Sequence, residues 1–374
     1  MNTKCRASCA ALPILALLAV GGGGSSARAE EKKPVVGLVM KSLANEFFKS
    51  MEEGARKFAA EDGTFTLVPV GMNSETDIDT QISAMENFIT QKVDLICVAP
   101  ADSVGLVAPV KKAIKAGITV VNFDVKLDDK ALAKAGLKDL VFVGPDNREG
   151  AYLAGNELAK KLGKGGKVFI IEGNPGADNA KMRKAGFEKA AKEGGLKVLV
   201  SRTAHWETEE ANTLVTNLLT SHPDVQGIMA ANDSMALGVV KALDAAGKSG
   251  KVQVVGFDNI PAIQKLVKDG KVLATIDQFG PEMAANCIKT GFRMKKGEHL
   301  KGWLKTPVKL ITATDLTIAT WSTSATPRHR TSSSSRGRRS GSPGCSHWTG
   351  WTSRFTGGRC TSSPARTAPA SRRW

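Results

Sequence analysis

The sequence lacks the short motifs that mark the common enzyme and metal-site chemistries. It has no Gly-x-Ser-x-Gly, no His-Glu-x-x-His and no paired-cysteine metal spacing, and Gly163–Lys167 is not followed by the Ser or Thr of a phosphate-binding loop. The 5 histidines are scattered, and His205, His222 and His299 fall in loops or at helix ends. These absences predict a protein with no catalytic residues, no metal and no cofactor.

The sequence also lacks a long apolar run. No stretch reaches the roughly 18 apolar residues that a membrane-spanning helix needs. The run Leu12–Val20 follows two basic residues and precedes small residues that end at Ala29. This order is typical of a secretory signal peptide. We therefore predict a signal peptide over 1–29, cleaved before Glu30, and a soluble mature protein in the periplasm.

Cysteine is scarce in the central part of the chain. Of the 6 cysteines, two lie in the predicted signal peptide and two beyond residue 321, which leaves Cys97 and Cys287. Cys97 belongs to an apolar predicted strand and Cys287 to a helical stretch, where buried free cysteines are common. The pattern favours two free thiols over a disulfide.

Acidic residues are absent from both ends of the chain, which accounts for most of the formal net charge of +16. Residues 1–29 hold three basic residues and 321–374 hold ten arginines, so about +3 remains for the rest, an ordinary value for globular domains. Residues 321–374 are rich in Ser, Thr, Arg, Pro and Gly and cannot form a core. We predict a disordered basic tail there, consistent with translation out of frame, rather than an arm for nucleic acid.

From Pro34 onward, short β-branched apolar runs alternate with helical patterns, which is typical of βαβ units on a parallel sheet. Strands are predicted at 35–40, 66–70, 95–99, 118–123 and 140–143, and again at 168–172, 198–202, 227–231, 252–257 and 272–276. The break near Gly144 predicts an α/β fold with two doubly wound parallel-sheet lobes and a cleft between them. The irregular stretch Lys126–Lys138 disfavours the alternative, a single eight-fold barrel.

Polar and aromatic side chains follow several predicted strands, at the sheet edge where ligands of such folds bind. They are Asn45, Phe47, Phe48, Asp124, Asn232 and Asp258. Aromatic rings can cover the C–H faces of a sugar, and Asp and Asn can pair with its hydroxyls. Two other interpretations stay open: the Phe pair can pack in the core, and an Asp or Asn after a strand can cap a helix.

Five stretches together carry a family resemblance. They are Ala44–Phe48, Asn217–Gln226, Asn232–Gly238, Val255–Asp258 and Ala274–Gln278. In this order, behind a signal peptide, they make residues 34–318 similar to the ribose-type sugar-binding proteins of ABC transporters, which are type I periplasmic binding proteins. The resemblance implies two lobes, 34–145 plus 279–307 and 146–276, joined by a hinge with three crossings near 144–147, 275–278 and 308–310.

The resemblance also implies the roles of individual residues. Phe47, Phe48 and Trp206 would sandwich the sugar ring, and Asn45, Asp124, Arg183, Asn232, Asp258 and Gln278 would bind its hydroxyls. Ribose binders carry an arginine where this chain has Val125, so that another pentose, a hexose or a polyol such as an inositol or xylitol is as plausible a ligand as ribose. The segment Lys126–Asp129 is a candidate source of a polar group that takes the place of this arginine.

We therefore expect a monomeric, non-enzymatic receptor that delivers a small sugar or polyol to the permease of an ABC transporter. One alternative is a periplasmic sensor that signals to a chemoreceptor or kinase. A sugar-responsive transcription regulator would need an N-terminal helix-turn-helix where the signal peptide lies. A glycan-processing enzyme would use Asp124 and Asp258 as an acid/base pair.

Overall fold

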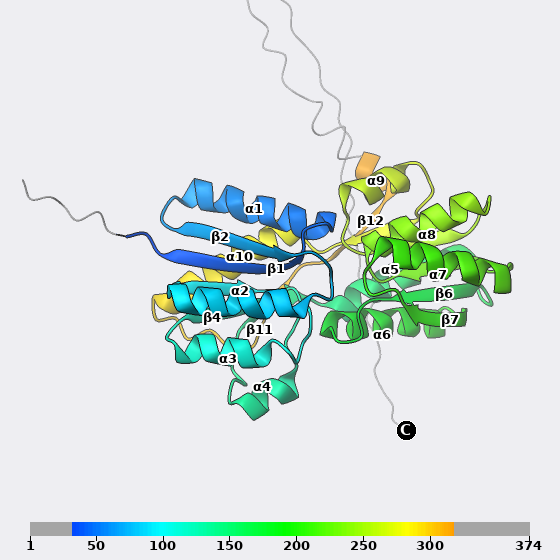
Figure 1. Cartoon of the computed structure of the whole chain (residues 1–374). Coiled ribbons are helices and arrows are strands. Elements are labelled where there is room, and N and C mark those ends of the chain that lie inside the picture. The colour runs from blue at the N-terminus through cyan, green and yellow to red at the C-terminus, as the bar shows by residue number, and fades with distance from the viewer. Residues whose placement is uncertain (1–31, 318–374) are drawn as a thin grey trace, which may run out of the picture. The chain divides into compact units, whose positions relative to one another are not determined.

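The computed structural model describes residues 32–317 and contains two six-stranded sheets with helices on both faces of each (Figure 1). The first sheet has the order β11-β5-β4-β3-β1-β2 and the second has the order β12-β10-β9-β8-β6-β7. All paired strands are parallel except β10 and β12. The predicted α/β fold with two doubly wound lobes is confirmed, and the eight-fold barrel is excluded.

The first sheet and its helices are built mainly from the first half of the described chain. The strands are β1 (Val35–Ser42), β2 (Thr66–Met72), β3 (Leu95–Val98), β4 (Thr119–Phe123), β5 (Phe142–Pro145) and β11 (Trp303–Thr306). The helices are α1 (Glu46–Asp62), α2 (Ile78–Gln91), α3 (Val107–Lys115), α4 (Asp129–Ala135) and the returning α10 (Gly280–Lys295). The central strand β3 is buried at every position, as expected for a parallel strand covered on both faces.

The second sheet takes most of its strands from the second half. They are β6 (Lys167–Glu172), β7 (Lys197–Thr203), β8 (Gly227–Ala230), β9 (Gln253–Val255), β10 (Ala274–Asp277) and β12 (Lys309–Thr312). Its helices are α5 (Asn147–Leu162), α6 (Asp178–Glu193), α7 (Thr208–Ser221), α8 (Asp233–Ala245) and α9 (Pro261–Lys268). The chain thus passes between the sheets three times: after β5, after β10, and between β11 and β12.

Three elements differ from the sequence prediction. The edge strands β11 and β12 were not predicted, because each has only four residues and neither carries a continuous apolar run. Helix α4 lies inside the stretch 126–138 that was predicted to be irregular, and it is a single short helix capped by Asp128. Short elements of this kind depend on their neighbours more than on their own sequence.

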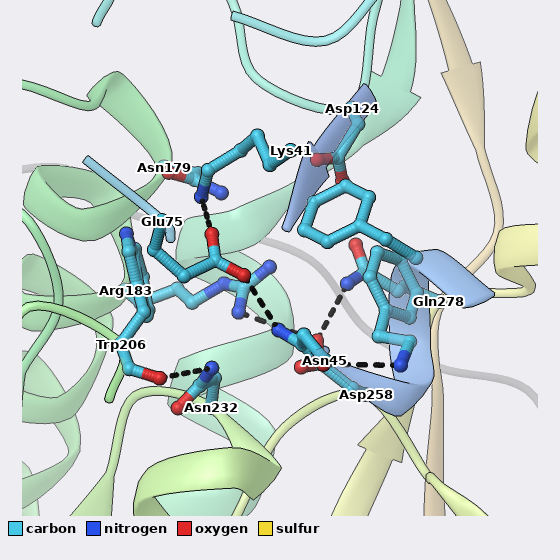
Figure 2. Close-up of a pocket in the computed structure, with 12 residues that line it drawn as sticks. Lys41, Asn45, Glu75, Asp124, Asn179, Arg183, Trp206, Asn232, Asp258 and Gln278 are labelled. Atoms are coloured by element: carbon cyan, nitrogen blue, oxygen red, sulfur yellow. Dashed lines mark hydrogen bonds and ion pairs between the residues drawn. The ribbon is translucent and has the colours of Figure 1, made fainter. Parts of the chain in front are cut away.

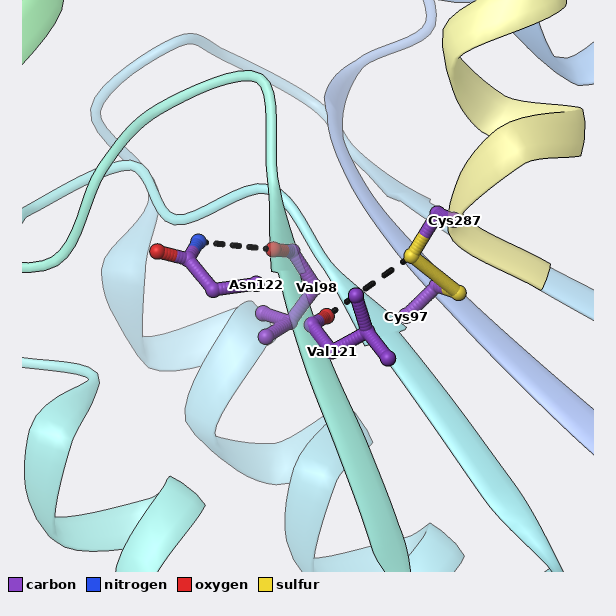
Figure 3. The surroundings of a disulfide bond; sticks show 5 residues. All are labelled: Cys97, Val98, Val121, Asn122 and Cys287. Carbon is purple, nitrogen blue, oxygen red and sulfur yellow. Dashed lines mark hydrogen bonds between the residues drawn. A yellow bond between two sulfur atoms is a disulfide. The ribbon is translucent and has the colours of Figure 1, made fainter. Parts of the chain in front are cut away.

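The prediction of two free thiols is wrong, because Cys97 and Cys287 form a disulfide (Figure 3). Cys97 lies on β3 and Cys287 on α10, which packs against β3 and β4. Both cysteines are fully buried, as predicted, and their Cα atoms are 6.2 Å apart. Sequence alone could not reveal this proximity, because 190 residues separate the two positions.

Among residues 32–317, no helix combines the length and the hydropathy required to cross a membrane. The predicted signal peptide and basic tail lie outside the described residues.

Candidate functional site

One polar cavity, with about 240 Å³ of empty space, is lined from both halves of the fold (Figure 2). Its walls hold Lys41, Asn45, Phe47, Phe48, Glu75, Asp124, Asn179, Arg183, Trp206, Asn232, Asp258 and Gln278. All nine residues singled out from the sequence line this one cavity. Lys41, Glu75 and Asn179 were missed, because nothing in their local sequence separates them from ordinary solvated polar residues.

The aromatic rings of the cavity come from α1 and from the loop before α7. The Phe47 and Phe48 rings meet edge to face, with centroids 5.2 Å apart, and both side chains are buried. The two rings therefore pack in the interior and also line the cavity, so a place in the core and a place at the cavity are compatible for this pair. Trp206 is 2% exposed and has a positive φ of 74°. A Cβ on Gly173 would meet its indole at 2.1 Å, so this glycine leaves the room that the ring occupies.

Two asparagines of the cavity are also helix caps. The Asn45 side chain accepts the backbone N–H of Phe47 at 3.0 Å at the start of α1, and the Asn232 side chain accepts that of Met235 at 2.9 Å at the start of α8. Their amide N–H groups make further bonds: that of Asn45 donates to Glu75 Oε1 at 2.9 Å, and that of Asn232 donates to the Trp206 carbonyl at 3.4 Å. Capping fixes the orientation of both side chains at the cavity.

Lys41 and Glu75 form a buried ion pair on the wall that belongs to the first sheet. Lys41 Nζ lies 2.6 Å from Glu75 Oε2, and the side chains are 3% and 2% exposed. Lys41 Nζ is also 5.4 Å from the ring centre of Phe48 and 5.3 Å from that of Trp206. Lys41, near the end of β1, therefore gives the cavity a cation that the sequence did not predict.

The segment Lys126–Asp129 does not supply a substitute for the arginine that ribose binders have at the position of Val125. Val125 is fully buried, and no residue of 126–129 is in the cavity wall. Lys126 instead pairs with Asp129 at 2.6 Å.

Arg183, on α6, is held by groups from helix α5 and from the loops after β8 and β9. Its Nε donates to Asn147 Oδ1 at 2.8 Å, and its Nη1 donates to the Ala231 carbonyl at 2.8 Å and to Asp258 Oδ1 at 3.4 Å. The guanidinium stacks on the ring of Phe257, 3.7 Å from its centre. A planar fork held this firmly presents its remaining N–H groups in a fixed direction.

Asp124 and Asp258 bring two carboxylates into the cavity from opposite sheets. Both have positive φ, 60° and 124°, and neither caps a helix in this structure. Asp258 Oδ1 accepts from Gln278 Nε2 at 2.7 Å. Backbone strain at non-glycine residues is typical of functional positions, where the surrounding fold stabilises it.

Burial changes the protonation of these carboxyl groups. It raises the pKa of Asp124 to about 6, against the opposing effects of Lys41 and Arg183. It also raises the pKa of Asp258 well above its ordinary value, and Arg183 again opposes the shift. Behind the cavity wall, burial raises the pKa of Asp233 to about 7, although Thr275 donates to that carboxylate at 2.8 Å.

Apart from Glu75 Oε2, which has Lys41 as its ion-pair partner, four polar atoms of the cavity are buried and have no hydrogen-bond partner within the described part of the chain. They are Asp124 Oδ1, Asn179 Oδ1, Trp206 Nε1 and Gln278 Oε1. Buried polar atoms in native proteins almost always find partners, so these four mark positions for the polar groups of a ligand. Three are acceptors and one is a donor, the mixture that hydroxyl groups satisfy.

No group of three or more His, Cys, Asp or Glu side chains within residues 32–317 is arranged to hold a metal ion. The cavity instead combines aromatic rings with amides, two cations and three carboxylates. Two parallel-sheet lobes that share one enclosed polar cavity define the class of bilobal solute-binding proteins.

Comparison with known proteins agrees with this class. A family model described as a periplasmic binding protein domain matches residues 36–299. The D-ribose/D-allose-binding protein of Pseudomonas aeruginosa is 48% identical over 287 residues, 75% of this chain and 90% of that protein. The D-allose-binding periplasmic protein of Escherichia coli K12 is 37% identical over 254 residues, 67% of this chain and 81% of that protein.

Solved structures agree as well. An ABC transporter solute binding protein from Burkholderia multivorans matches with a TM-score of 0.73 and 46% identity over 75% of this chain and 99% of that one. Another, from Actinobacillus succinogenes 130z with bound D-allose, has a TM-score of 0.73 and 39% identity over 76% and 100% of the two chains. The chain therefore belongs to the periplasmic binding protein family, and the family and the sugar-binding ABC-importer class expected from its sequence are confirmed.

Proposed function

We propose that this protein binds a neutral monosaccharide or polyol in the cavity of Figure 2 and delivers it to the permease of an ABC importer. The observation that carries the proposal is the set of four unpartnered buried polar atoms, which face one space together with three aromatic rings. Asp124 and Asn45 lie on the side of the first sheet, and Arg183 and Asp258 on the side of the second. A ligand that touches both sets stabilises the closed arrangement of the lobes.

The charges of the cavity favour a neutral ligand. Lys41 pairs with Glu75 and Arg183 with Asp258, so two of the three carboxylates already have a cation. The walls of the cavity combine three aromatic rings with amides and charged groups, which suits the C–H faces and the hydroxyls of a single sugar ring. Relatives are named for D-ribose and D-allose, and we propose that an aldose of this kind is the ligand here.

Thermal unfolding of the purified protein with a panel of pentoses, hexoses and polyols tests the proposal. A ligand at 1,000 times its Kd stabilises the folded state by about 4.1 kcal/mol, which gives a clear rise in Tm. D-allose and D-ribose should give the largest shifts. If no sugar or polyol shifts the Tm, the protein is not a receptor for this class.

We also propose that the lobes comprise 34–145 plus 279–307 and 146–276, that residues 1–29 are removed on export to the periplasm, and that the mature protein acts as a monomer without catalytic activity. Intact mass of the protein from its host tests the cleavage before Glu30. Incubation with the bound sugar, followed by analysis for products, tests the absence of catalysis by Asp124 and Asp258.

A chemoreceptor is the alternative partner to the permease, because either could bind the sugar-loaded form. Capture of membrane proteins with and without sugar distinguishes the two. Recovery of a permease only in the presence of sugar supports import, and recovery of a chemoreceptor alone supports the sensor.

A further inference from the structure

Away from the cavity, the two lobes meet through a loop of the first lobe, 99–106, and a loop of the second, 173–177. Ser103 is the centre of this contact and is 1% exposed. Its backbone N–H donates to the Gly176 carbonyl at 3.1 Å, and its hydroxyl oxygen accepts the backbone N–H of Asp178 at 2.9 Å. The hydroxyl itself donates to the Lys126 carbonyl at 2.7 Å, which fixes its direction.

The bond to Asp178 meets a specific need of helix α6. Asp178 is the first residue of this helix, and the N-cap position is Ala177, whose side chain has no oxygen to accept a backbone N–H. In helices α1, α2, α4, α5 and α8, the side chain of the N-cap residue accepts the backbone N–H of the second or third helical residue. Helix α6 lacks such a bond from Ala177, and Ser103 Oγ of the other lobe instead accepts the N–H of its first residue, Asp178.

Helix α6 also carries two residues of the ligand cavity. Asn179 lies in its first turn, and Arg183 lies about one turn further along. Asn179 Oδ1 is one of the four buried atoms without a partner. How firmly the first turn of α6 is held in place therefore decides where this atom is presented to a ligand.

We propose that Ser103 is a positioning residue, which caps helix α6 across the cleft when the lobes meet and thereby orders the turn that presents Asn179 and Arg183. This coupling makes part of the sugar site depend on closure and not on the second lobe alone. The effect on affinity rests on the proposed function, whereas the capping itself does not.

The close fit of the two loops supports this coupling. A Cβ on Gly176 would lie 2.3 Å from Asp102 Oδ2, so the second lobe leaves room here for a side chain of the first. Gly176 does not have a positive φ, which means that the contact and not the backbone conformation demands glycine. Asp102 is itself held in place, because its Oδ1 accepts the backbone N–H groups of Val104 and Gly105 at 2.8 Å each.

The test compares Ser103→Ala with the double variant Ser103→Ala/Ala177→Ser, which gives the first turn of α6 a side-chain acceptor from its own N-cap, for the N–H of the second or third helical residue. Loss of a cap hydroxyl should weaken D-allose and D-ribose binding about tenfold, and the added serine should restore most of it. Ser221→Ala removes a helix hydroxyl at the exposed end of α7 and should change nothing. Isothermal titration gives the affinities.

Two results would overturn the proposal. Unchanged affinity in Ser103→Ala shows that Ser103 does not position the site. Weakened affinity without recovery in the double variant shows that the Ser103 hydroxyl acts through its bond to the Lys126 carbonyl and not by ordering the first turn of α6.

Hydrogen exchange of the sugar-loaded protein, in which the lobes meet, tests the capping directly. Amides at the start of α6 should exchange faster in Ser103→Ala than in the wild type, and equal exchange would overturn the capping role. A wild type that binds no sugar would contradict the proposed function, whereas equal exchange in sugar-loaded protein would contradict the cap alone.

Gly176→Ala provides a second variant that leaves all cavity residues in place. The added methyl should hold the loops apart and weaken sugar binding, and Asp102→Ser in the same chain should relieve the contact and recover affinity. Full affinity in Gly176→Ala alone would show that the two loops need not meet for binding.

Discussion

At the scale of single residues, the cavity shows how one side chain serves both the fold and a ligand. Asn45 and Asn232 cap helices with one atom and face the cavity with another. Asp258 accepts from Gln278 and Arg183 and remains on the wall. Each such residue is already held before a ligand binds, which reduces the entropy lost on binding.

Replacement of Asp258 by alanine should weaken sugar binding at least about a hundredfold. The change removes an acceptor on the cavity wall and the charged partner that holds Arg183, and truncating one partner of a buried, hydrogen-bonded charge pair at a binding site costs about 2–5 kcal/mol in affinity. Asp258→Asn, which keeps the shape and one acceptor oxygen, should lose less. Calorimetric titration measures both variants, and an alanine variant with the wild-type Kd would exclude Asp258 from the site.

The pH dependence of binding follows from Asp124. Burial raises its pKa to about 6, and hydroxyl donors of a sugar favour the ionised form. Affinity should therefore fall as pH drops through 6, by about tenfold between pH 7.5 and pH 5. Titrations in two buffers with different ionisation enthalpies measure the Kd and the protons released. A Kd that stays constant over this range would contradict the assignment, and Asp124→Asn should reduce the slope.

The same pKa affects the stability of the fold in the opposite direction. Between the ordinary value of 3.8 and about 6, the folded state binds a proton at Asp124 that the unfolded state does not. The contribution of this group to stability is therefore greatest at low pH and decreases as pH rises through that window.

At the scale of elements, the first lobe has to hold two pieces of chain that are far apart in sequence. Helix α10 returns after the whole of the second sheet and packs on β3, β4 and α1. The disulfide between Cys97 and Cys287 joins this helix to the central strand (Figure 3). It restricts the unfolded chain across 190 residues, a long loop for which the entropic stabilisation is large.

Cys97→Ala/Cys287→Ala should lower the free energy of unfolding by up to about 5 kcal/mol, the chain-entropy value for a loop of this length. Urea unfolding with and without reductant measures the loss. Sugar affinity should stay unchanged, because neither cysteine lines the cavity. If the urea midpoint is the same for the double variant and the wild type, the bridge does not stabilise the fold.

At the scale of residues 32–317 as a whole, the site exists only where two sheets meet. Residues from both lobes face the same space, and the contacts of Glu75 with Glu207 and of Ser103 with Asp178 also cross between the lobes. A receptor of this kind can open by a hinge at the three chain crossings without disturbing either core.

The radius of gyration in solution should decrease when sugar is added, because the ligand stabilises the closed arrangement of the lobes. Small-angle X-ray scattering measures this change, and Asp258→Ala at the same sugar concentration is the matched control, which should not contract. A wild-type radius that is independent of saturating sugar would exclude closure as the response to binding.

The sequence was sufficient for features that depend on neighbouring residues. Apolar runs and helical periodicity predicted ten of the strands and the division into two lobes, and residues directly after those strands included most of the cavity wall. These features follow from backbone geometry, because the carboxyl ends of parallel strands meet at one edge of a sheet.

Tertiary structure alone decided the features that depend on distant partners. Lys41 and Glu75 are typical solvated residues in sequence and become a buried pair only because β1 and the loop after β2 face the same cavity. Cys97 and Cys287 are 190 residues apart, and the packing of α10 on β3 makes them partners. A charge, a thiol or a helix end gains its partner only in the assembled fold. Local periodicity contains no information about the distance in space between residues that are far apart in the sequence.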